Sequence, residues 1–502
     1  MKKLYALLFL SGLLFVSCFD DDTAVMPDNT PDPDPITYTS GSADFSNYVS
    51  VGNSLTAGFS DAALFIDGQT ASFPNMLASN FALTGGGNFS TPLMADNLGG
   101  LTLGGQPIPG FGNRLILDFS SGSPAPVPVE GQGATEISSV LSGPFNNMGV
   151  PGAKSYHLLA PEYGNVAGVA LGLANPYYAR FASSPTASVL GDAAAQNPSF
   201  FSVWIGLNDV LGFAVSGGAG VDQTGNLDAT TYGGTDISDP NIVAGSIDAI
   251  LATLTAGGAD GIIANIPDVT STPYFTTVPH NPVPLDEGTA ALLNGAFAAY
   301  NGGLAQLQGL GLISAEELAQ RTVSFSAGEG NALLILDEDL TDLTGFNPAL
   351  TNMRQATAED LIVLTASTFI GTEVGGNPTL LNGVSVPLTD NWVLTPEEQD
   401  LILTATAAYN QTIEALAAQY DLAFVDANAF VSSVIATGVP LSDGSVVTGD
   451  FGTGGGFSLD GIHPSPRGSA LVANLFVDVI NAKYGSNLPG VNPLDFTGLY
   501  IN

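Results

Sequence analysis

Residues 47–58 read NYVSVGNSLTAG, a short apolar stretch followed by a glycine, an asparagine and a serine. An apolar run of this length, bounded by glycine, predicts a buried β-strand over residues 47–52. A serine directly after such a strand lies at the carboxyl edge of the sheet, where open α/β folds bind their ligands. Ser54 is therefore the first candidate site residue, and Gly52 beside it allows the backbone to come close to a substrate.

The rest of the chain alternates apolar strands with helices. Further strands are predicted over residues 198–206, 261–266 and 422–425, and helices over residues 246–254, 409–420 and 466–484. The last helix has the clearest start, because Ser465 is a natural N-cap and Pro466 suits the first helical position. Such alternation is typical of a parallel, doubly wound α/β sheet.

Two stretches do not follow this alternation. Residues 60–140 are rich in glycine, proline and asparagine, and residues 270–400 mix turns with short helical pieces and a predicted hairpin around 323–336. We expect both to be insertions on a smaller core. The folded domain is then expected over residues 45–490, with a C-terminal tail at 491–502.

Composition excludes several functions. The 502 residues contain 47 Asp and Glu against 9 Lys and Arg, which gives a formal charge of −38. Such a surface repels nucleic acids and anionic headgroups, and it favours solubility. One cysteine and three histidines exclude a His/Cys metal cluster, and no calcium-loop pattern of spaced aspartates is present. The sequence therefore predicts neither a metal nor a cofactor, and it leaves the oligomeric state open.

The first 44 residues predict export. Lys2 and Lys3 precede a short apolar run, which predicts a signal peptide over residues 1–17. The segment before Cys18 resembles the lipobox of bacterial lipoproteins, although Phe15 replaces the usual leucine. This resemblance implies lipidation of Cys18, while a buried free cysteine after an ordinary signal peptide is the alternative. Residues 18–44, rich in Pro and Asp, predict an extended tether, and the acidic start after Cys18 resembles lipoproteins of Bacteroidetes. We expect an exported, outer-membrane lipoprotein that is displayed on the cell surface, while the sequence leaves a periplasmic orientation open.

Three later segments carry polar groups that can act with Ser54. Residues 146–153 (NNMGVPGA) form a Gly-rich loop whose N–H groups can bind an anion. Asn208 follows the strand at 198–206 and can donate its side-chain amide to an oxyanion, or simply cap the next element. His463 precedes the last helix, whose positive end favours a neutral imidazole. Asp460, three residues earlier, can bind the other ring nitrogen and fix the tautomer.

Together these segments resemble the four blocks of the SGNH, or GDSL-like, hydrolases. The matching stretches occur in the family's order and read Gly52-Asn53-Ser54-Leu55, Asn147 through Gly152, Gly206-Leu207-Asn208-Asp209 and Asp460-Gly461-Ile462-His463. The resemblance implies a flavodoxin-like three-layer α/β/α sandwich and ester hydrolysis without a metal. It also implies Ser54 as nucleophile, His463 as base and Asp460 as its orienter. The oxyanion hole would consist of the Ser54 and Gly152 N–H groups and the Asn208 amide.

Asn53 stands where the family's name motif has aspartate. That aspartate is not the triad acid, so the implied triad is complete in this chain. The function expected is hydrolysis of acyl esters, of lipids or of acylated glycans. Removal of acetyl groups from polysaccharides is one alternative, although Trp204 and Trp392 are the only tryptophans available for sugar stacking. A non-catalytic surface-binding lipoprotein is the other.

Overall fold

The computed structural model describes residues 36–120, 122 and 124–501. Every helix and strand among them lies in the unit Tyr38–Asn502. The predicted signal peptide, Cys18 and most of the tether lie outside the described residues, so lipidation stays a prediction. Among the described residues, no helix combines the length and apolar character that crossing a bilayer requires.

A five-stranded parallel sheet forms the centre of the fold. In spatial order its strands are β18 (Ala423–Val425), β9 (Asp260–Ala264), β8 (Phe200–Trp204), β1 (Tyr48–Gly52) and β7 (Asn147–Gly149). All neighbouring strands run parallel. Read from β7, the chain order is 2-1-3-4-5, which is the flavodoxin-like order. The ends of β7, β1 and β8 therefore border the switch point of the sheet, where doubly wound folds bind ligands.

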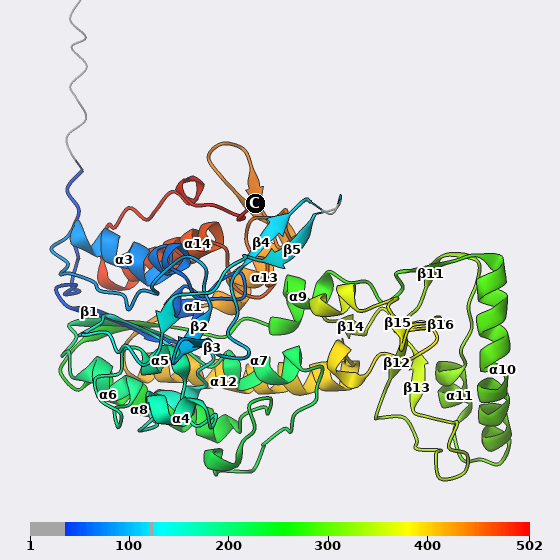
Figure 1. The fold of residues 1–502 in the computed structure, drawn as a ribbon. Coiled ribbons are helices and arrows are strands. Elements are labelled where there is room, and N and C mark those ends of the chain that lie inside the picture. Colours follow the sequence, from blue (N-terminus) through cyan, green and yellow to red (C-terminus); the bar gives the residue numbers. More distant parts are fainter. Residues whose placement is uncertain (1–35, 121, 123, 502) are drawn as a thin grey trace, which may run out of the picture. The chain divides into compact units, whose positions relative to one another are not determined.

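Helices cover both faces of this sheet and give three layers (Figure 1). On one face α3 (Phe73–Ala82) packs against α14 (Pro466–Tyr484), and α14 also contacts β18. On the other face α8 (Pro240–Thr255) packs against α6 (Val189–Ala194) and α12 (Pro396–Gln419). Every residue of β1 and of β8 is buried, as a parallel sheet covered on both faces requires. The chain is thus a three-layer α/β/α sandwich.

The strongest sequence signals are confirmed. The strands predicted at 198–206, 261–266 and 422–425 are β8, β9 and β18, and the helix predicted at 466–484 is α14. Ser465 Oγ accepts the N–H of Gly468 at 3.0 Å, and Gly485 ends the helix with a φ of 69°. Both ends of α14 therefore carry the caps that the sequence predicts.

Two local predictions are wrong, and one predicted helix is confirmed but begins earlier than expected. Residues 147–149 of the predicted Gly-rich loop form the edge strand β7, because they pair with β1. The hairpin predicted around 323–336 is absent: β11 (Gly328–Asn331) pairs with β10 (Val283–Leu285), and β12 (Leu334–Leu336) pairs with β13 (Met353–Gln355). The helix predicted at 409–420 begins at Pro396 in α12, since Thr395 and Glu398 form a capping box there.

The stretch 60–140 contributes α3 to the sandwich. Its other elements are short and are α2 (Ile66–Thr70), β2 (Leu101–Leu103), β3 (Gln106–Pro107), β4 (Leu115–Asp118), β5 (Ala125–Pro128) and β6 (Thr135–Glu136). Residues 150–180 add α4 (Val166–Val169) and α5 (Pro176–Ala179).

The stretch 270–400 contributes no strand to the central sheet. It contains α9 (Pro273–Thr276), α10 (Glu287–Gly309), α11 (Ala315–Arg321) and β10 to β13. It also contains β14 (Leu361–Ile362), β15 (Glu373–Val374), β16 (Asn377–Leu381) and β17 (Val393–Leu394). After α12 come α13 (Ala427–Thr437), β19 (Val439–Pro440) and β20 (Val446–Val447).

Candidate active site

Ser54 is the first residue of the short helix α1 (Ser54–Ala57), directly after β1. Asn53 caps this helix, with its Oδ1 accepting the N–H of Leu55 at 3.0 Å. Only glycine fits at position 52, because a Cβ there would lie 2.4 Å from the carbonyl oxygen of Trp204. The N–H of a first helical residue has no acceptor within its helix. The tight turn thus places both the hydroxyl and the N–H of Ser54 at the sheet edge.

His463 and Asp460 meet Ser54 in a continuous chain of hydrogen-bond distances. The Nε2 of His463 lies 2.8 Å from the Oγ of Ser54, and its Nδ1 lies 2.9 Å from the Oδ2 of Asp460. An ionised carboxylate only accepts, so the proton of the neutral imidazole lies on Nδ1. The lone pair on Nε2 then faces the Ser54 hydroxyl, as a general base must. The structure therefore brings together the three residues proposed for the triad, although Ser54 lies more than 400 positions from Asp460 and His463 in the sequence.

Asp460 is held ionised by its surroundings. Its Oδ1 accepts the N–H groups of Ile462 and His463 at 2.9 Å each, and its Oδ2 accepts the N–H of Ala62 at 3.0 Å. Burial of the carboxyl favours the neutral form, but the imidazole of His463 and the backbone donors outweigh it. Together they lower the pKa of Asp460 to about 2. A permanent negative charge therefore faces Nδ1 of the imidazole.

Asp61 is a site residue that sequence reasoning missed. Its Oδ1 accepts the N–H of Leu459 at 3.0 Å, and its own N–H donates to the Oγ of Ser458 at 2.9 Å. Asp61 and Ala62 have φ values of 51° and 63°, which turn the N–H of Ala62 toward Asp460. Burial raises the pKa of Asp61 to about 6, helped by the charge of Asp460. Two adjacent non-glycine residues in the left-handed region give no pattern that a sequence reader could detect.

Asn208 and Gly152 lie at the ends of the two strands that flank β1. Asn208 starts α7 (Asn208–Val215) after β8, and its Nδ2 donates one hydrogen bond of 2.9 Å to the carbonyl of Ala153. The second hydrogen of this amide is thus free to serve another acceptor. Gly152 follows β7 with a φ of 79°, in the left-handed region that favours glycine. The three predicted oxyanion donors therefore stand on adjacent strand ends.

Asp209 fastens the loop that carries Gly152. Its carboxylate is fully buried and accepts the N–H and the hydroxyl of Ser155 at 2.8 and 3.1 Å. The neighbouring Lys154 donates its Nζ to the carbonyl of Asp236 at 2.7 Å. The sequence block at 206–209 contained this residue, but its partner could not be assigned before the loop was seen in space.

An apolar cavity of about 60 Å³ lies beside these residues. Its wall includes residues next to the site residues in the sequence. Leu55 follows Ser54, and Leu207 precedes Asn208. Ile462 and Pro464 flank His463. Phe430 from α13 and Leu471 from α14 line the cavity on the side of these two helices. Ser54, Gly152, Asn208 and His463 do not line the cavity, which adjoins the site through the residues next to Ser54, Asn208 and His463 in the sequence.

Among the described residues, one group of His, Cys, Asp or Glu side chains is close enough to share a metal ion. It consists of Glu338, Asp390 and Glu398, and it contains none of the residues of the candidate active site.

Comparisons with known proteins give a fold likeness only. No protein-family model matches the chain, and no curated protein matches it. Among solved structures, the chain is similar to a variant of Axe2, an acetyl-xylooligosaccharide esterase from Geobacillus stearothermophilus. The two chains are 10% identical with a TM-score of 0.32, and the match covers 88% of this chain and 96% of the Axe2 chain. LAE5, an alpha/beta hydrolase from the metagenome of Lake Arreo in Spain, is 10% identical with a TM-score of 0.29, over 88% and 97%. An extracellular lipase from Streptomyces rimosus is 12% identical with a TM-score of 0.28, over 87% and 99%. Residue roles in this chain therefore rest on its own geometry.

Proposed function

We propose that this chain is a serine-dependent carboxylester hydrolase of the SGNH, or GDSL-like, type. The observation that carries the proposal is the hydrogen-bonded series from the Oγ of Ser54 through His463 to Asp460, at 2.8 and 2.9 Å. A serine hydroxyl is a weak nucleophile until a base takes its proton, and this series supplies the base and its orienter.

The reaction runs in two halves. His463 takes the proton of Ser54 as Oγ bonds to the ester carbon, and the carbonyl oxygen becomes an oxyanion. The N–H groups of Ser54 and Gly152 and the amide of Asn208 donate to that oxygen. The C–O bond to the alcohol then breaks, and the alcohol leaves with the proton from His463. Water, deprotonated by His463, attacks the acyl carbon, and the bond to Oγ then breaks. The acid leaves, and His463 returns the proton to the Oγ of Ser54.

The cavity favours an acyl chain longer than acetyl. A water-sized group fills about 10–15 Å³ of such a volume, so the 60 Å³ beside Leu55 take about four to six groups of that size. Each buried methylene contributes about 0.8 kcal/mol. Butyryl and hexanoyl esters therefore suit the cavity better than acetyl or palmitoyl esters.

A panel of p-nitrophenyl esters from acetate to palmitate tests this function. We expect kcat/KM for the butyrate to exceed that for the acetate by about 15-fold, because two methylenes add about 1.6 kcal/mol of burial. The palmitate should be slower than the hexanoate, since its chain exceeds the cavity. A fluorophosphonate should label Ser54 covalently, as read by peptide mass spectrometry.

Other outcomes of the panel decide between the alternatives. A preference for acetate would instead support a carbohydrate O-acetyl esterase of the same fold. No turnover of any ester, together with no labelling of Ser54, would mean that the site is not catalytic and that the chain acts as a surface-binding lipoprotein.

Replacing Asn208 with alanine should lower kcat by about 10²- to 10³-fold, because one oxyanion donor is lost. KM should change much less, since the hydrogen bond forms fully only in the transition state. Steady-state kinetics with the best ester of the panel measure both constants. Asn241→Ala, at the start of α8, removes a like side chain away from the site and should match the wild type. An equal loss in both variants, or a drop only in melting temperature, would argue against a role for Asn208 in the oxyanion hole.

A further inference from the structure

Three carboxylates from distant parts of the sequence meet outside the active site. Glu338 follows β12, Asp390 begins a short 3₁₀ helix at Asp390–Trp392, and Glu398 lies in the first turn of α12. One oxygen from each lies within 4.8 Å of the others. Like charges at this separation repel strongly unless a cation or a proton lies between them.

Glu398 is the buried member of this cluster, with 4% of its surface exposed. Its Oε2 accepts the N–H of Thr395 at 2.7 Å and its hydroxyl at 3.0 Å, as part of the helix cap. Its Oε1 is buried and has no hydrogen-bond partner. An unpaired buried carboxylate oxygen is costly, whereas a bound cation would satisfy it.

The surroundings of Glu398 are acidic. A hollow of about 370 Å³ is lined by Glu398 and Glu338 together with Asp222, Asp339 and Glu397, and no basic side chain lines it. The backbone of Gly218, three residues after α7, packs directly against Glu398. A Cβ at position 218 would lie 1.6 Å from Oε1 of Glu398. Within the described part of the chain, Glu338, Asp390 and Glu398 form no ion pair with a basic side chain.

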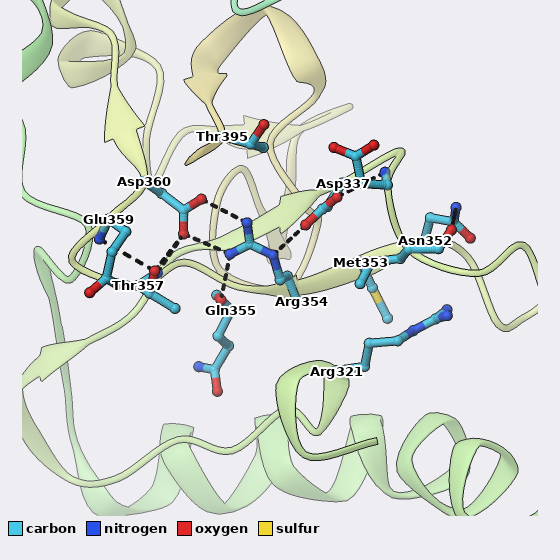
Figure 2. Close-up of polar contacts among 12 residues, drawn as sticks. Arg321, Asp337, Asn352, Met353, Arg354, Gln355, Thr357, Glu359, Asp360 and Thr395 are labelled. Atoms are coloured by element: carbon cyan, nitrogen blue, oxygen red, sulfur yellow. Dashed lines mark hydrogen bonds and ion pairs between the residues drawn. The ribbon is translucent and has the colours of Figure 1, made fainter. Parts of the chain in front are cut away.

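Arg354, on the strand that pairs with β12, bonds to carboxylates outside the cluster (Figure 2). Arg354 lies between two carboxylates, bonded through Nε to Asp337 and through both terminal nitrogens to Asp360 at 2.6 and 2.7 Å. The same Asp337 accepts the N–H of Asp339 at 3.0 Å. Both neighbours of Glu338 are thereby fixed by these bonds, and none of the hydrogen bonds of Arg354 goes to a member of the cluster. Glu338 is thus held in place, and Arg354 makes no ion pair with it.

We propose that Glu338, Asp390 and Glu398 bind a calcium ion. The donors are carboxylate oxygens with no histidine or cysteine among them, which selects a hard cation over zinc. Oxygens that all lie within 4.8 Å of one another fit around Ca²⁺, whose ligands lie about 2.3–2.6 Å from the ion and whose coordination geometry is flexible. The ion joins the segment after β12, the 3₁₀ helix at Asp390–Trp392 and the first turn of α12, and therefore stabilises the connection between them.

Calcium and terbium binding to the full chain, first treated with a chelator, test this site. We expect Ca²⁺ to raise the melting temperature by several degrees and to bind with a stoichiometry of one in calorimetry. Tb³⁺, a luminescent substitute for Ca²⁺, should emit when tryptophan is excited, because Trp392 lies two residues from Asp390. Trp392→Phe should abolish this emission while leaving the Ca²⁺-dependent shift in melting temperature.

Substitutions of the three proposed ligands test whether calcium binds at this cluster. Glu338→Gln with Asp390→Asn removes two charges that are not buried, so the fold should persist, and affinity for Ca²⁺ should fall more than about tenfold. Glu398→Gln keeps a side chain that can cap α12 and should weaken binding similarly. Glu373→Gln, an exposed charge in β15, is the matched control and should bind as the wild type does.

Three results would each overturn the proposal. They are a wild type whose melting temperature and calorimetry do not respond to Ca²⁺, a double variant that still binds as tightly as the wild type, and an equal or stronger response to Mg²⁺. None of these results depends on whether the chain hydrolyses esters.

Discussion

Ser54→Ala is expected to lower kcat for ester hydrolysis by about 10⁵- to 10⁶-fold, because no other group on the sheet edge can form the acyl-enzyme. The fold should persist, since alanine fits where the serine side chain lies and only the bond to His463 is lost. The melting temperature of the variant should therefore stay close to that of the wild type. Steady-state kinetics with the preferred ester and a thermal melt measure the two effects.

Ser79→Ala is the matched control for this variant. Ser79 lies exposed on α3, and its hydroxyl bonds only within its own helix, to the carbonyl of Asn75. Its removal should leave kcat unchanged. If Ser54→Ala turned over esters at a rate near that of the wild type, the nucleophile would be another residue and the proposed mechanism would be wrong.

The core strands could be predicted because each carries its own signal. Residues 200–204 and 261–264 are short apolar runs of strand length, and α14 has a serine cap, a proline at its first position and a glycine at its end. These are local preferences that agree with the tertiary structure. An element can be predicted from sequence when its local preferences and its tertiary packing favour the same structure.

Elements that depend on a distant partner could not be predicted. The strand β7 is three residues long, Asn147–Gly149, and it is a strand because β1 lies beside it. The first half of α12 contains Glu397, Glu398 and Asp400 and lacks a simple apolar stripe, although the Thr395 to Glu398 capping box could have marked its start. In both cases tertiary packing decides the structure more than local propensity does.

The candidate site residues also differ in whether a local sequence signal marks them. Ser54, Asp460 and His463 stand in recognisable short segments, so they could be named as candidates before any coordinates. Asp61 could not, because its function is to hold a loop nearly 400 positions away, through Leu459 and Ser458. The cluster of Glu338, Asp390 and Glu398 has no fixed spacing either, and only folding brings its members together.

Asp460→Asn is expected to lower kcat by about 10⁴-fold while Ser54 and His463 stay in place. The asparagine amide would present either a donor to Nδ1 or a weak neutral acceptor, so the imidazole would lose the tautomer that leaves Nε2 free for Ser54. The charge that stabilises the imidazolium is lost as well. Steady-state kinetics at neutral pH measure the loss.

The same substitution should also affect stability in a pH-dependent way. The pKa of Asp460 is lowered to about 2 in the folded chain. A lowered pKa means that the ionised carboxyl stabilises the fold above the ordinary pKa near 3.8, and that this contribution is lost as the pH falls toward 2. The melting temperatures of wild type and variant should therefore differ most at neutral pH and converge in acid.

Combining the two substitutions separates catalysis from structure. If Asp460 acts only through His463 on the nucleophile, Ser54→Ala with Asp460→Asn should be no slower than Ser54→Ala alone, because residues of one catalytic unit are not additive. Asp495→Asn, a like change near the C-terminus in the 3₁₀ helix Pro493–Asp495, should leave kcat unchanged. A double variant slower than Ser54→Ala by the full factor expected of Asp460→Asn would place the effect of Asp460 outside the triad, in the loop that Ala62 and Ile462 help to hold.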